Sequence, residues 1–518
     1  MRRLSPSLAL ALLWSLAAVA AEPDAARLYR DYCASCHGAE RLGGSGPALL
    51  PEVLGRLTPQ KAAEVIARGR PATMMPAFAS LLDAAQIRSL ADYIFTPPET
   101  PPRWGAEEIR RSRRRFVEDS ALPEKPVFAA DPLNLFVLVE KGDHHVSILD
   151  GDRFARLARF ATSRALHGGP KFSPDGRFVY FASRDGWIEK YDLWSLQKVL
   201  KVRAGINTRN LAVSHDGRIL AVANYLPSTL VLLDAASFEP LEVREVRSAQ
   251  GKPSRISAVY QARPRRSFIL ALKDAPELWE IGYSDPLPHQ FAPFAHSYEL
   301  GQEEALPPDT RFPVRRIFLE EPIDDFFFDP SYRHLIGAAR ESDHAVVVHL
   351  DVGRIIARIP MGGMPHLASG ITFRSGGRRL FATPHLREPV ITVVDMQSWK
   401  VVKRIRTLGP GFFARSHENS PYFWVDVFFG PHRDALHVID KERLEIVKTL
   451  TPSPGRTAAH VEFDRDGRHA LVSIWEDDGA VVVYDARSLE EVRRIRARRP
   501  SGKYNVWNKI SLSEGTSH

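Results

Sequence analysis

The stretch FSPDGRFVY at residues 172–180 and the stretch IEKYD at residues 188–192 decide the fold of most of this chain. Together they read as an Asp-Gly turn, a strand rich in apolar residues, and a second strand that ends in an aspartate. Residues 213–221 (VSHDGRILA) and 463–471 (FDRDGRHAL) repeat the turn and the first strand. The chain therefore contains an internal repeat of short antiparallel strands.

The closing strand of this repeat occurs eight times. The copies lie at residues 146–150, 188–192, 230–234, 279–283, 346–351, 391–395, 436–440 and 481–485. Asp150, Asp192 and Asp234 are 42 residues apart, a period that suits a propeller blade of four strands. We therefore predict an all-β eight-bladed propeller over residues 126–518, with an insertion at about residues 284–313 and a cavity on its axis.

The N-terminal part of the chain carries a different motif, CASCH at residues 33–37, which holds the only two cysteines. Two thiols at this spacing, followed by a histidine, form thioethers with the two vinyl groups of a haem while the histidine ligates the iron. A zinc site or a redox dithiol is the alternative for such a cysteine pair. Cys33 and Cys36 are therefore the predicted attachment points of one covalent haem c, and His37 is its predicted axial ligand.

The residues around this motif fit a small all-α class I cytochrome c domain at residues 22–95. Apolar residues at helical spacing predict three helices, over residues 25–33, 58–68 and 83–94. The Pro-bounded loop at residues 70–78 resembles the Met-Pro-Ala-Phe segment of class I cytochromes c, which favours Met75 as the sixth iron ligand. Met74 is the alternative ligand, and packing in the core is the alternative role. Thioether ligation raises the haem potential, so this haem is expected to accept or carry electrons.

Residues 1–21 have the layout of a secretory signal peptide, with a basic start, a short apolar stretch and an exit of small residues. An uncleaved anchor is the alternative, but the apolar stretch is shorter than the roughly 20 residues that a membrane span needs. The expected location is the periplasm, with no transmembrane segment. Residues 96–125 are expected to be a linker that begins with an extended Pro-rich stretch, and the arginine-rich run at 110–115 reads as a solvated helix face.

The formal net charge of +8 is modest for 518 residues, and the arginines and lysines are spread over the strand-like repeats. No nucleic-acid motif accompanies them, so a nucleic-acid partner is not expected. A basic cavity for a ligand with several carboxylates is the better interpretation of this charge.

A small cytochrome c domain followed by an eight-bladed propeller resembles the cytochrome cd1 family over essentially the whole mature chain. The similar stretches are LHG at 166–168, SRDG at 183–186, INTR at 206–209, MPH at 364–366, TPHL at 383–386 and GKYNVWN at 502–508. In that family the propeller holds a second, non-covalent tetrapyrrole, haem d1. The resemblance implies that His167 is the proximal ligand of its iron, that Arg184 and Arg209 bind its carboxylates, and that Lys141 is a weaker carboxylate partner.

The chain departs from the pattern of the nitrite-reducing members at three places. Those members use two histidines above the haem d1 iron to protonate nitrite, whereas this chain has only His366 and no histidine at residues 322–326. His460 stands where glutamine is expected in the reductases, and Tyr504 stands where phenylalanine is expected. These changes favour proton chemistry on the macrocycle over chemistry at the iron. His366 is then an axial ligand or a pocket residue, while His417 fits both branches of the family as a cofactor contact.

This pattern resembles the dihydro-haem d1 dehydrogenase branch, which performs the last step of haem d1 synthesis. The resemblance implies oxidation of a propionate side chain to an acrylate, with His460 as the principal base and haem c as the electron acceptor. Tyr504 would orient the carboxylate or relay a proton. Structural hydrogen bonding between blades is the alternative role for both residues.

The implied partners are the tetrapyrrole substrate, a soluble electron acceptor, and the nitrite reductase that receives haem d1. A nitrite reductase of the same family and a non-catalytic carrier of haem d1 are the alternative functions. A propeller that binds a partner protein without any tetrapyrrole is a further alternative, which the matches at His167, Arg184 and Arg209 disfavour.

Overall fold

The computed structural model describes most of the chain. The described residues are 24–44, 46–55, 57–69, 75–284, 311–339, 341–512 and 514–515, together with the backbone of two strands at 294–297 and 302–305. The chain divides into two compact units, Met1–Thr100 and Pro101–His518. The predicted signal peptide and the alternative haem ligand Met74 lie outside the described residues.

The N-terminal unit is helical. Its helices are α1 (Ala25–Tyr32), α2 (Ala34–His37), α3 (Pro51–Leu54), α4 (Pro59–Arg68) and α5 (Ala84–Phe95). Three helices begin where a side chain caps the backbone, since Asp24, Thr58 and Asp83 accept hydrogen bonds from backbone N–H groups of the first turn. Tyr29 and Leu90 are fully buried where α1, α4 and α5 pack together. The three predicted helices are therefore confirmed.

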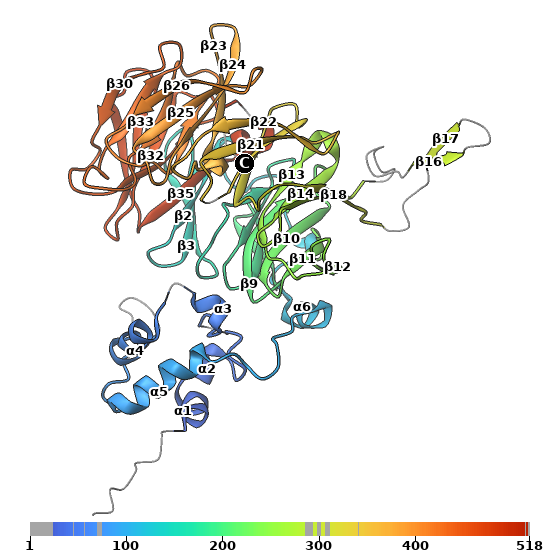
Figure 1. Cartoon of the computed structure of the whole chain (residues 1–518). Coiled ribbons are helices and arrows are strands. Elements are labelled where there is room, and N and C mark those ends of the chain that lie inside the picture. The colour runs from blue at the N-terminus through green and yellow to red at the C-terminus, as the bar shows by residue number, and fades with distance from the viewer. Residues whose placement is uncertain are drawn as a thin grey trace, which may run out of the picture. The chain divides into compact units, whose positions relative to one another are not determined.

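The C-terminal unit is a ring of eight antiparallel sheets, which confirms the predicted propeller (Figure 1). From the axis outward, blade 1 contains β35 (Pro500–Asn505), β2 (Leu135–Glu140), β3 (His145–Asp150) and β4 (Arg156–Ala161). Blade 2 contains β5 (Lys171–Phe172), β6 (Phe178–Ala182), β7 (Trp187–Asp192) and β8 (Gln197–Arg203). Blade 3 contains β9 (Asn207–Val213), β10 (Ile219–Leu226), β11 (Thr229–Asp234) and β12 (Pro240–Glu245).

The other five blades have the same order of strands. Blade 4 contains β13 (Ile256–Ala262), β14 (Ser267–Leu272), β15 (Glu277–Gly282) and β18 (Val314–Phe318). Blade 5 contains β19 (Asp325–Phe328), β20 (His334–Ala338), β21 (His344–His349) and β22 (Arg354–Pro360). Blade 6 contains β23 (Ile371–Ser375), β24 (Arg378–Pro384), β25 (Val390–Asp395) and β26 (Lys400–Arg406). Blade 7 contains β27 (Ala414–Ser416), β28 (Tyr422–Asp426), β29 (Leu436–Asp440) and β30 (Glu445–Leu450). Blade 8 contains β31 (Ala458–Phe463), β32 (His469–Ile474), β33 (Ala480–Asp485) and β34 (Glu491–Arg496).

The repeated closing strand of the sequence is the third strand of every blade. In six of the eight blades an aspartate at the end of this strand accepts hydrogen bonds from the backbone of the following turn; Asp395 Oδ1, for example, accepts from Gln397 and Ser398 at 2.9 Å each. A carboxylate is favoured at this place because the turn leaves backbone N–H groups without partners in the sheet. The repeat is therefore readable in the sequence because most third strands are followed by the same turn.

The ring is closed by strands from the two ends of the propeller segment. The last strand, β35, pairs with the first, β2, so that Tyr504 lies opposite Val137 and Asn505 opposite Phe136. The short C-terminal helix α7 (Val506–Ser511) follows directly, with Asn505 as its N-cap. This closure carries residues from the C-terminal end of the chain to the axis of the propeller.

Part of the segment expected as a linker has regular structure. It contains α6 (Ala106–Ser112), the short strand β1 (Arg114–Arg115), which pairs with β8, and a 3-10 turn at Asp119–Ala121. Ile109 of α6 is fully buried against blades 2 and 3, which explains why this amphipathic stretch folds onto the propeller. The insertion between β15 and β18 contains a hairpin of β16 (Phe294–Ser297) and β17 (Gln302–Ala305).

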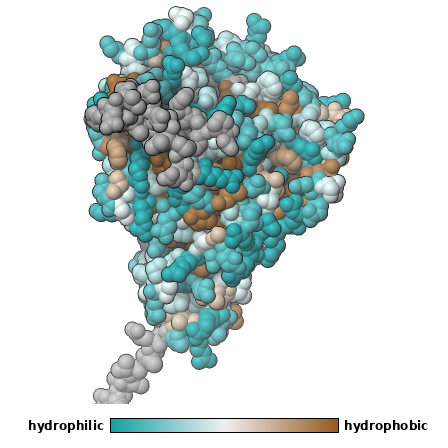
Figure 2. Space-filling view, turned by 90° about the vertical axis from the view of Figure 1, so that its right-hand side faces the viewer, coloured by the Kyte–Doolittle hydropathy of each residue, from teal (hydrophilic) through white to brown (hydrophobic). Residues whose placement is uncertain are grey.

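The exterior of the propeller is largely hydrophilic on the face shown in Figure 2. The outermost strands alternate accordingly; in β22 exposed and more buried residues follow one another. Within the described part of the chain, no helix is both long enough and apolar enough to cross a membrane.

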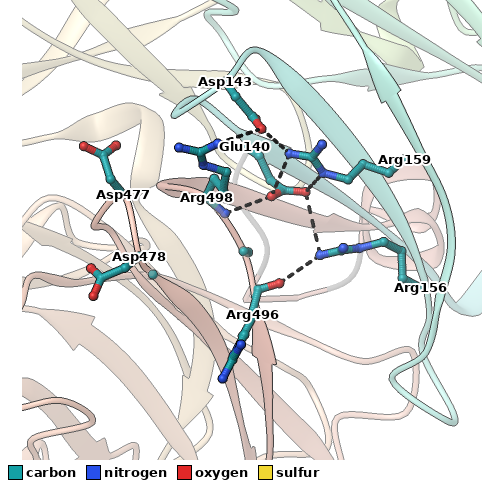
Figure 3. A pocket seen from close by; sticks show the side chains of 10 residues that line it. Glu140, Asp143, Arg156, Arg159, Asp477, Asp478, Arg496 and Arg498 are labelled. Carbon is teal, nitrogen blue, oxygen red and sulfur yellow. Dashed lines mark hydrogen bonds and ion pairs between the residues drawn. The ribbon is translucent and has the colours of Figure 1, made fainter. Parts of the chain in front are cut away.

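A buried carboxylate stabilises the junction between blades 1 and 8. Glu140 is 1% exposed and accepts hydrogen bonds from Ser147 Oγ (2.6 Å), Arg159 Nε (3.1 Å) and the backbone N–H of Arg498 (2.9 Å). Beside it lies a cavity of about 680 Å³ (Figure 3). The cavity is lined by Glu140, Asp143, Arg156, Arg159, Asp477, Asp478, Gly479, Arg496, Ala497 and Arg498. The acidic and basic side chains here largely pair with each other or with nearby residues, so Glu140 serves the closure of the ring.

Replacing Glu140 by glutamine is expected to lower the free energy of unfolding of the propeller by about 2 kcal/mol, because the hydrogen bonds from Ser147, Arg159 and the backbone of Arg498 lose their charged acceptor. Urea unfolding followed by tryptophan fluorescence measures the change. Asp477→Asn is the matched control from the same cavity, since Asp477 pairs with Arg499 at the surface and should cost less than about 1 kcal/mol. Equal effects of the two substitutions would contradict this role of Glu140.

Candidate functional site

The innermost strands bring polar side chains from distant parts of the chain to the axis. Neighbouring innermost strands contact each other around the ring, for example β9 with β13, β27 with β31, and β31 with β35. Seven of the polar residues that they contribute are Lys171, Arg209, Tyr260, Asp325, Arg415, His460 and Tyr504. We refer to these seven residues as the axial cluster.

His167 lies in the loop that leads into β5, next to two arginines. Its Nδ1 donates to the backbone oxygen of Arg209 at 2.8 Å, so Nε2 carries the lone pair. Arg184 Nη2 and Arg209 Nη1 lie 3.0 and 3.1 Å from Nε2. The chain thus presents an imidazole lone pair and two guanidinium groups at one place, which is the donor set expected for an iron ligand and two carboxylates.

The charged groups around His167 are positive. Burial, followed by the charges of Arg209, Arg184 and Lys141, holds its pKa well below the ordinary value. Lys141 is in the turn after β2, and its ammonium lies 5.8 Å from the centre of the Trp475 ring. The imidazole is therefore neutral at neutral pH, the form that binds a metal.

His366 lies in the loop that leads into β23, the innermost strand of blade 6. Its Nδ1 donates to the backbone oxygen of Phe412 at 2.5 Å and lies 2.9 Å from Ser369 Oγ. Burial lowers its pKa to about 4, so it is also a neutral imidazole. The ring packs against Phe412 with centroids 4.2 Å apart, which fixes its orientation.

His460 is buried at the start of β31 in an unusual backbone conformation. Its φ of 50° lies in the left-handed region, at a register shift between β31 and β32. It is 1% exposed, and neither ring nitrogen has a hydrogen-bond partner among the described residues. A strained backbone and two unsatisfied nitrogens in a buried ring are costly for stability, which is the pattern of a residue kept for function.

The surroundings of His460 keep its ring neutral and in place. The pKa of His460 is held well below the ordinary value, mainly by burial and further by the charges of Lys503, Arg415 and Lys509. Its backbone N–H donates to Asp426 Oδ2 at 3.1 Å, and its ring lies 4.7 Å from that of Phe413.

Tyr504 packs against His460, with ring centroids 5.1 Å apart. Burial raises the pKa of Tyr504 to about 12, so the phenol keeps its proton. Two glycines make room for it, since a Cβ on Gly169 or Gly502 would lie 3.3 or 2.7 Å from the hydroxyl. Gly169 follows the His167 loop, so the tyrosine ring links this loop to His460.

The remaining sequence-predicted propeller residue, His417, follows β27, and both of its ring nitrogens bind nearby backbone. Nε2 donates to the oxygen of Arg465 at 3.1 Å, and Nδ1 accepts from the N–H of Asn419 at 3.1 Å. The contacts of its ring are to the turn at residues 465–467, and the structure does not bring it together with His460. A contact of His417 with a cofactor stays a prediction.

Sequence reasoning missed several members of the axial cluster. Asp325 accepts a hydrogen bond from Tyr260 at 2.9 Å and lies 3.7 Å from Arg209 Nη2. It falls in the stretch 322–326 where a histidine was expected, so the place of the missing imidazole is held by a carboxylate. Lys171, Tyr260 and Arg415 had no sequence signal, because each is one polar residue in a short strand.

The N-terminal unit holds the second set of predicted ligands. His37 ends α2, and its Nδ1 donates to the backbone oxygen of Pro47 at 2.7 Å. The imidazole ring covers Gly46, where a Cβ would lie 2.7 Å from a ring atom. Cys33 and Cys36 are both free thiols within one helical turn of His37, so the donor set fits a covalently attached haem.

Met75, the predicted sixth ligand, packs partly buried on the core of this unit. Its carbonyl oxygen lies 2.7 Å from where a Cβ on Gly69 would stand, and the φ of Gly69 is 66°, so this loop requires glycine there. Ligation by Met75 stays a prediction.

Two family models match the chain. The cytochrome D1 heme domain matches residues 130–509, and the family of cytochrome C oxidase, cbb3-type, subunit III matches residues 20–94. The second match covers the helical unit with its cysteine motif, and the first covers the propeller.

Similar proteins extend over the whole chain. Dihydro-heme d1 dehydrogenase of Pseudomonas aeruginosa is 54% identical over 511 residues, which are 99% of this chain and 99% of that protein. Nitrite reductase of Stutzerimonas stutzeri is 25% identical, over 95% of this chain and 94% of that protein. The solved structure of dihydro-heme d1 dehydrogenase NirN in complex with DHE superposes with a TM-score of 0.86 at 54% identity, covering 93% of this chain and 99% of that one. The chain therefore belongs to the cytochrome D1 heme domain family.

Proposed function

We propose that this protein oxidises dihydro-haem d1 to haem d1, converting a propionate side chain into an acrylate as the last step of haem d1 synthesis. The observation that carries the proposal is the buried pair of His460 and Tyr504 on the axis of the propeller. The relative that is 54% identical over 99% of both chains is named dihydro-heme d1 dehydrogenase, which supports the same activity here.

The reaction breaks one C–H bond on each of two adjacent carbons, forms a C=C bond, and releases two protons and two electrons. A base must take a proton from the side chain. His460 suits this role because its imidazole is neutral and its nitrogens have no hydrogen-bond partner among the described residues. Tyr504 keeps its proton and can donate a hydrogen bond to the carboxylate of the same side chain.

The basic surroundings explain how a histidine of low pKa can act as a base. Lys503, Arg415 and Lys509 add to burial in holding down the pKa of His460 in the protein without ligand. Carboxylates of the substrate offset these charges when they bind, which raises the pKa of the imidazole and strengthens it as a base. Substrate binding therefore activates His460.

Covalent haem c supplies a one-electron acceptor in the N-terminal unit, so each oxidation requires two transfers. We propose that a soluble protein then takes the electrons onward, and that the nitrite reductase receives the haem d1. The signal-peptide pattern of residues 1–21 supports the periplasm as the location.

Nitrite reduction is the second candidate function, because a nitrite reductase is similar over 95% of the chain. The carboxylate of Asp325 disfavours it. This carboxylate, paired with Arg209 and Tyr260, stands in the stretch where the second histidine would be expected and is not an imidazole that could protonate nitrite.

Anaerobic mixing of the full-length protein, with haem c attached, with dihydro-haem d1 tests the proposal. The absorbance spectrum should change to that of haem d1 while haem c becomes reduced. Binding without conversion would instead support a carrier, and efficient nitrite turnover by the loaded protein would support a reductase.

His167→Ala is expected to weaken binding of dihydro-haem d1 by about tenfold and to change the spectrum of the bound iron, because one axial ligand is lost. Absorbance titration and electron paramagnetic resonance measure the two effects. His349→Ala is the matched control, since His349 ends β21 in the outer part of blade 5 and should leave both unchanged. An unchanged spin state in His167→Ala would exclude His167 as a ligand.

A further inference from the structure

A second group of charged residues lies deeper on the axis, beyond His460. Lys503 is fully buried and donates to the backbone oxygen of His460 and to Ser473 Oγ. Arg415 is 3% exposed; its Nη1 donates to the oxygen of Ala414, while its Nε has no hydrogen-bond partner among the described residues. A buried guanidinium with an unsatisfied nitrogen lacks one hydrogen-bond acceptor, which the carboxylate of a ligand could supply.

Lys509 reaches the same place from the other end of the propeller. It belongs to α7, and its Nζ lies 5.7 Å from the centre of the Tyr504 ring. The pKa of Lys509 is lowered to about 7, mainly by burial and further by the charge of Arg415. The ammonium is thus placed against another cation, which a bound anion would relieve.

Helix α7 is hydrogen-bonded to two blades of the propeller. Arg263 of blade 4 donates to the backbone oxygen of Ile510 at 3.0 Å, and Asn508 donates to the backbone oxygen of Phe463 of blade 8 at 2.9 Å. These blades lie on different sides of the ring (Figure 1). His167 and His366 lie before innermost strands, whereas α7 lies after one. Because the innermost strands of the blades all run in the same direction, α7 lies at the end of the propeller opposite to these two histidines.

Basic residues outnumber acidic ones around Lys509. The basic residues are Lys171, Arg415, Lys503 and Lys509, and the acidic ones are Asp325, Asp426 and Glu462. Asp426 is occupied by three backbone N–H groups, those of Phe412, Phe413 and His460. Glu462 Oε2 lies 3.9 Å from Arg415 Nε, too far for a hydrogen bond. Further negative charge is needed from a ligand.

We propose that Lys509 and Arg415 bind the carboxylate of the propionate that is oxidised and so hold its two carbons against His460. This inference rests on the proposed function. Tyr504 connects the groups geometrically, because its ring contacts His460 on one side and the Lys509 ammonium approaches the same ring. A side chain lying along Tyr504 would place its carboxylate at the cations and its methylene groups at the imidazole.

The test compares Lys509→Met with the wild type, both as full-length protein with haem c, using two probes. The probes are dihydro-haem d1 and its fully methyl-esterified form, and absorbance titration gives Kd. Lys509→Met should raise Kd by about 10-fold or more for the acid, because a charge-assisted hydrogen bond is lost, and by less than about twofold for the ester. The same ratio for both probes would overturn the proposal.

Two further variants keep the result interpretable. Lys509→Arg retains the charge and should restore most of the affinity for the acid, whereas Lys448→Met, on the exposed strand β30, is a matched loss of one lysine with no expected effect. Haem c content and the thermal unfolding midpoint show whether each variant is folded. If the wild type binds the acid but does not convert it, the proposed function fails, while the ratio of the Kd values still tests the carboxylate site.

The pH dependence of binding gives an independent readout. The groups that face Lys509 are Arg415, Glu462, Lys171, His460 and Tyr504, of which Glu462 and His460 are both in β31. In the protein without ligand, Lys509 loses its proton as the pH rises through about 7, so affinity for the acid should begin to fall there. Burial lowers the pKa of Lys171 to about 8, so its loss of a proton should produce a second decrease in affinity at higher pH. Lys509→Met should remove only the first step, and its persistence would overturn the proposal.

Discussion

Replacing His460 by alanine is expected to slow the oxidation of dihydro-haem d1 at saturating substrate by about 100-fold or more, the usual contribution of a general base. Binding should change little, since the imidazole nitrogens make no hydrogen bonds within the described structure and the basic groups around it remain. Single-turnover absorbance spectroscopy gives the rate, and titration gives Kd. A large loss of rate with a small change in Kd separates a role in proton transfer from a role in binding.

The controls for this variant use the histidines of the chain itself. His460→Gln keeps a polar side chain of similar size but cannot accept a proton at neutral pH, so it should be as slow as His460→Ala. His437→Gln removes another buried histidine, which accepts from the N–H of Leu408 at 3.1 Å and lies 2.9 Å from Thr449 Oγ1 in blade 7. It should retain the wild-type rate. Unchanged turnover in His460→Ala would remove this residue from the mechanism.

The architecture was predictable because it repeats. Most blades have the same aspartate-capped turn after the third strand, so the pattern of Asp150, Asp192 and Asp234 recurs along the chain. The haem c motif was equally readable, since two thioethers and an axial histidine require one fixed spacing. The arginine-rich run at 110–115 indicated a solvated helix face, but the packing of α6 on the propeller was not predicted, because Ile109 is its single fully buried apolar residue.

The candidate site was only partly predictable. His167, His366, His460 and Tyr504 are in stretches that resemble a known family. Asp325 and Lys509 become visible only when the ring closes, because single polar residues in separate blades carry no local pattern. The low pKa of His460 also depends on cations from three different elements and could not be read from its neighbours in sequence.

Removing both thioether attachments with Cys33→Ala and Cys36→Ala is expected to abolish covalent haem and, with it, all electron transfer to a protein acceptor. The propeller is a separate compact unit with its own cores, so dihydro-haem d1 should still bind with a Kd within about threefold of the wild type. Haem staining after denaturing electrophoresis, absorbance titration and steady-state turnover measure the three properties.

The matched control is Ser35→Ala, which changes the exposed residue between the two cysteines and should leave haem attachment and turnover intact. A small-molecule one-electron oxidant should restore part of the conversion in the double variant, because the chemistry at His460 does not require the N-terminal unit. Full turnover with the protein acceptor in the absence of covalent haem would show that electrons leave the propeller by another route. Loss of both turnover and oxidant rescue, with binding retained, would mean that haem c is needed in the bond-breaking step itself.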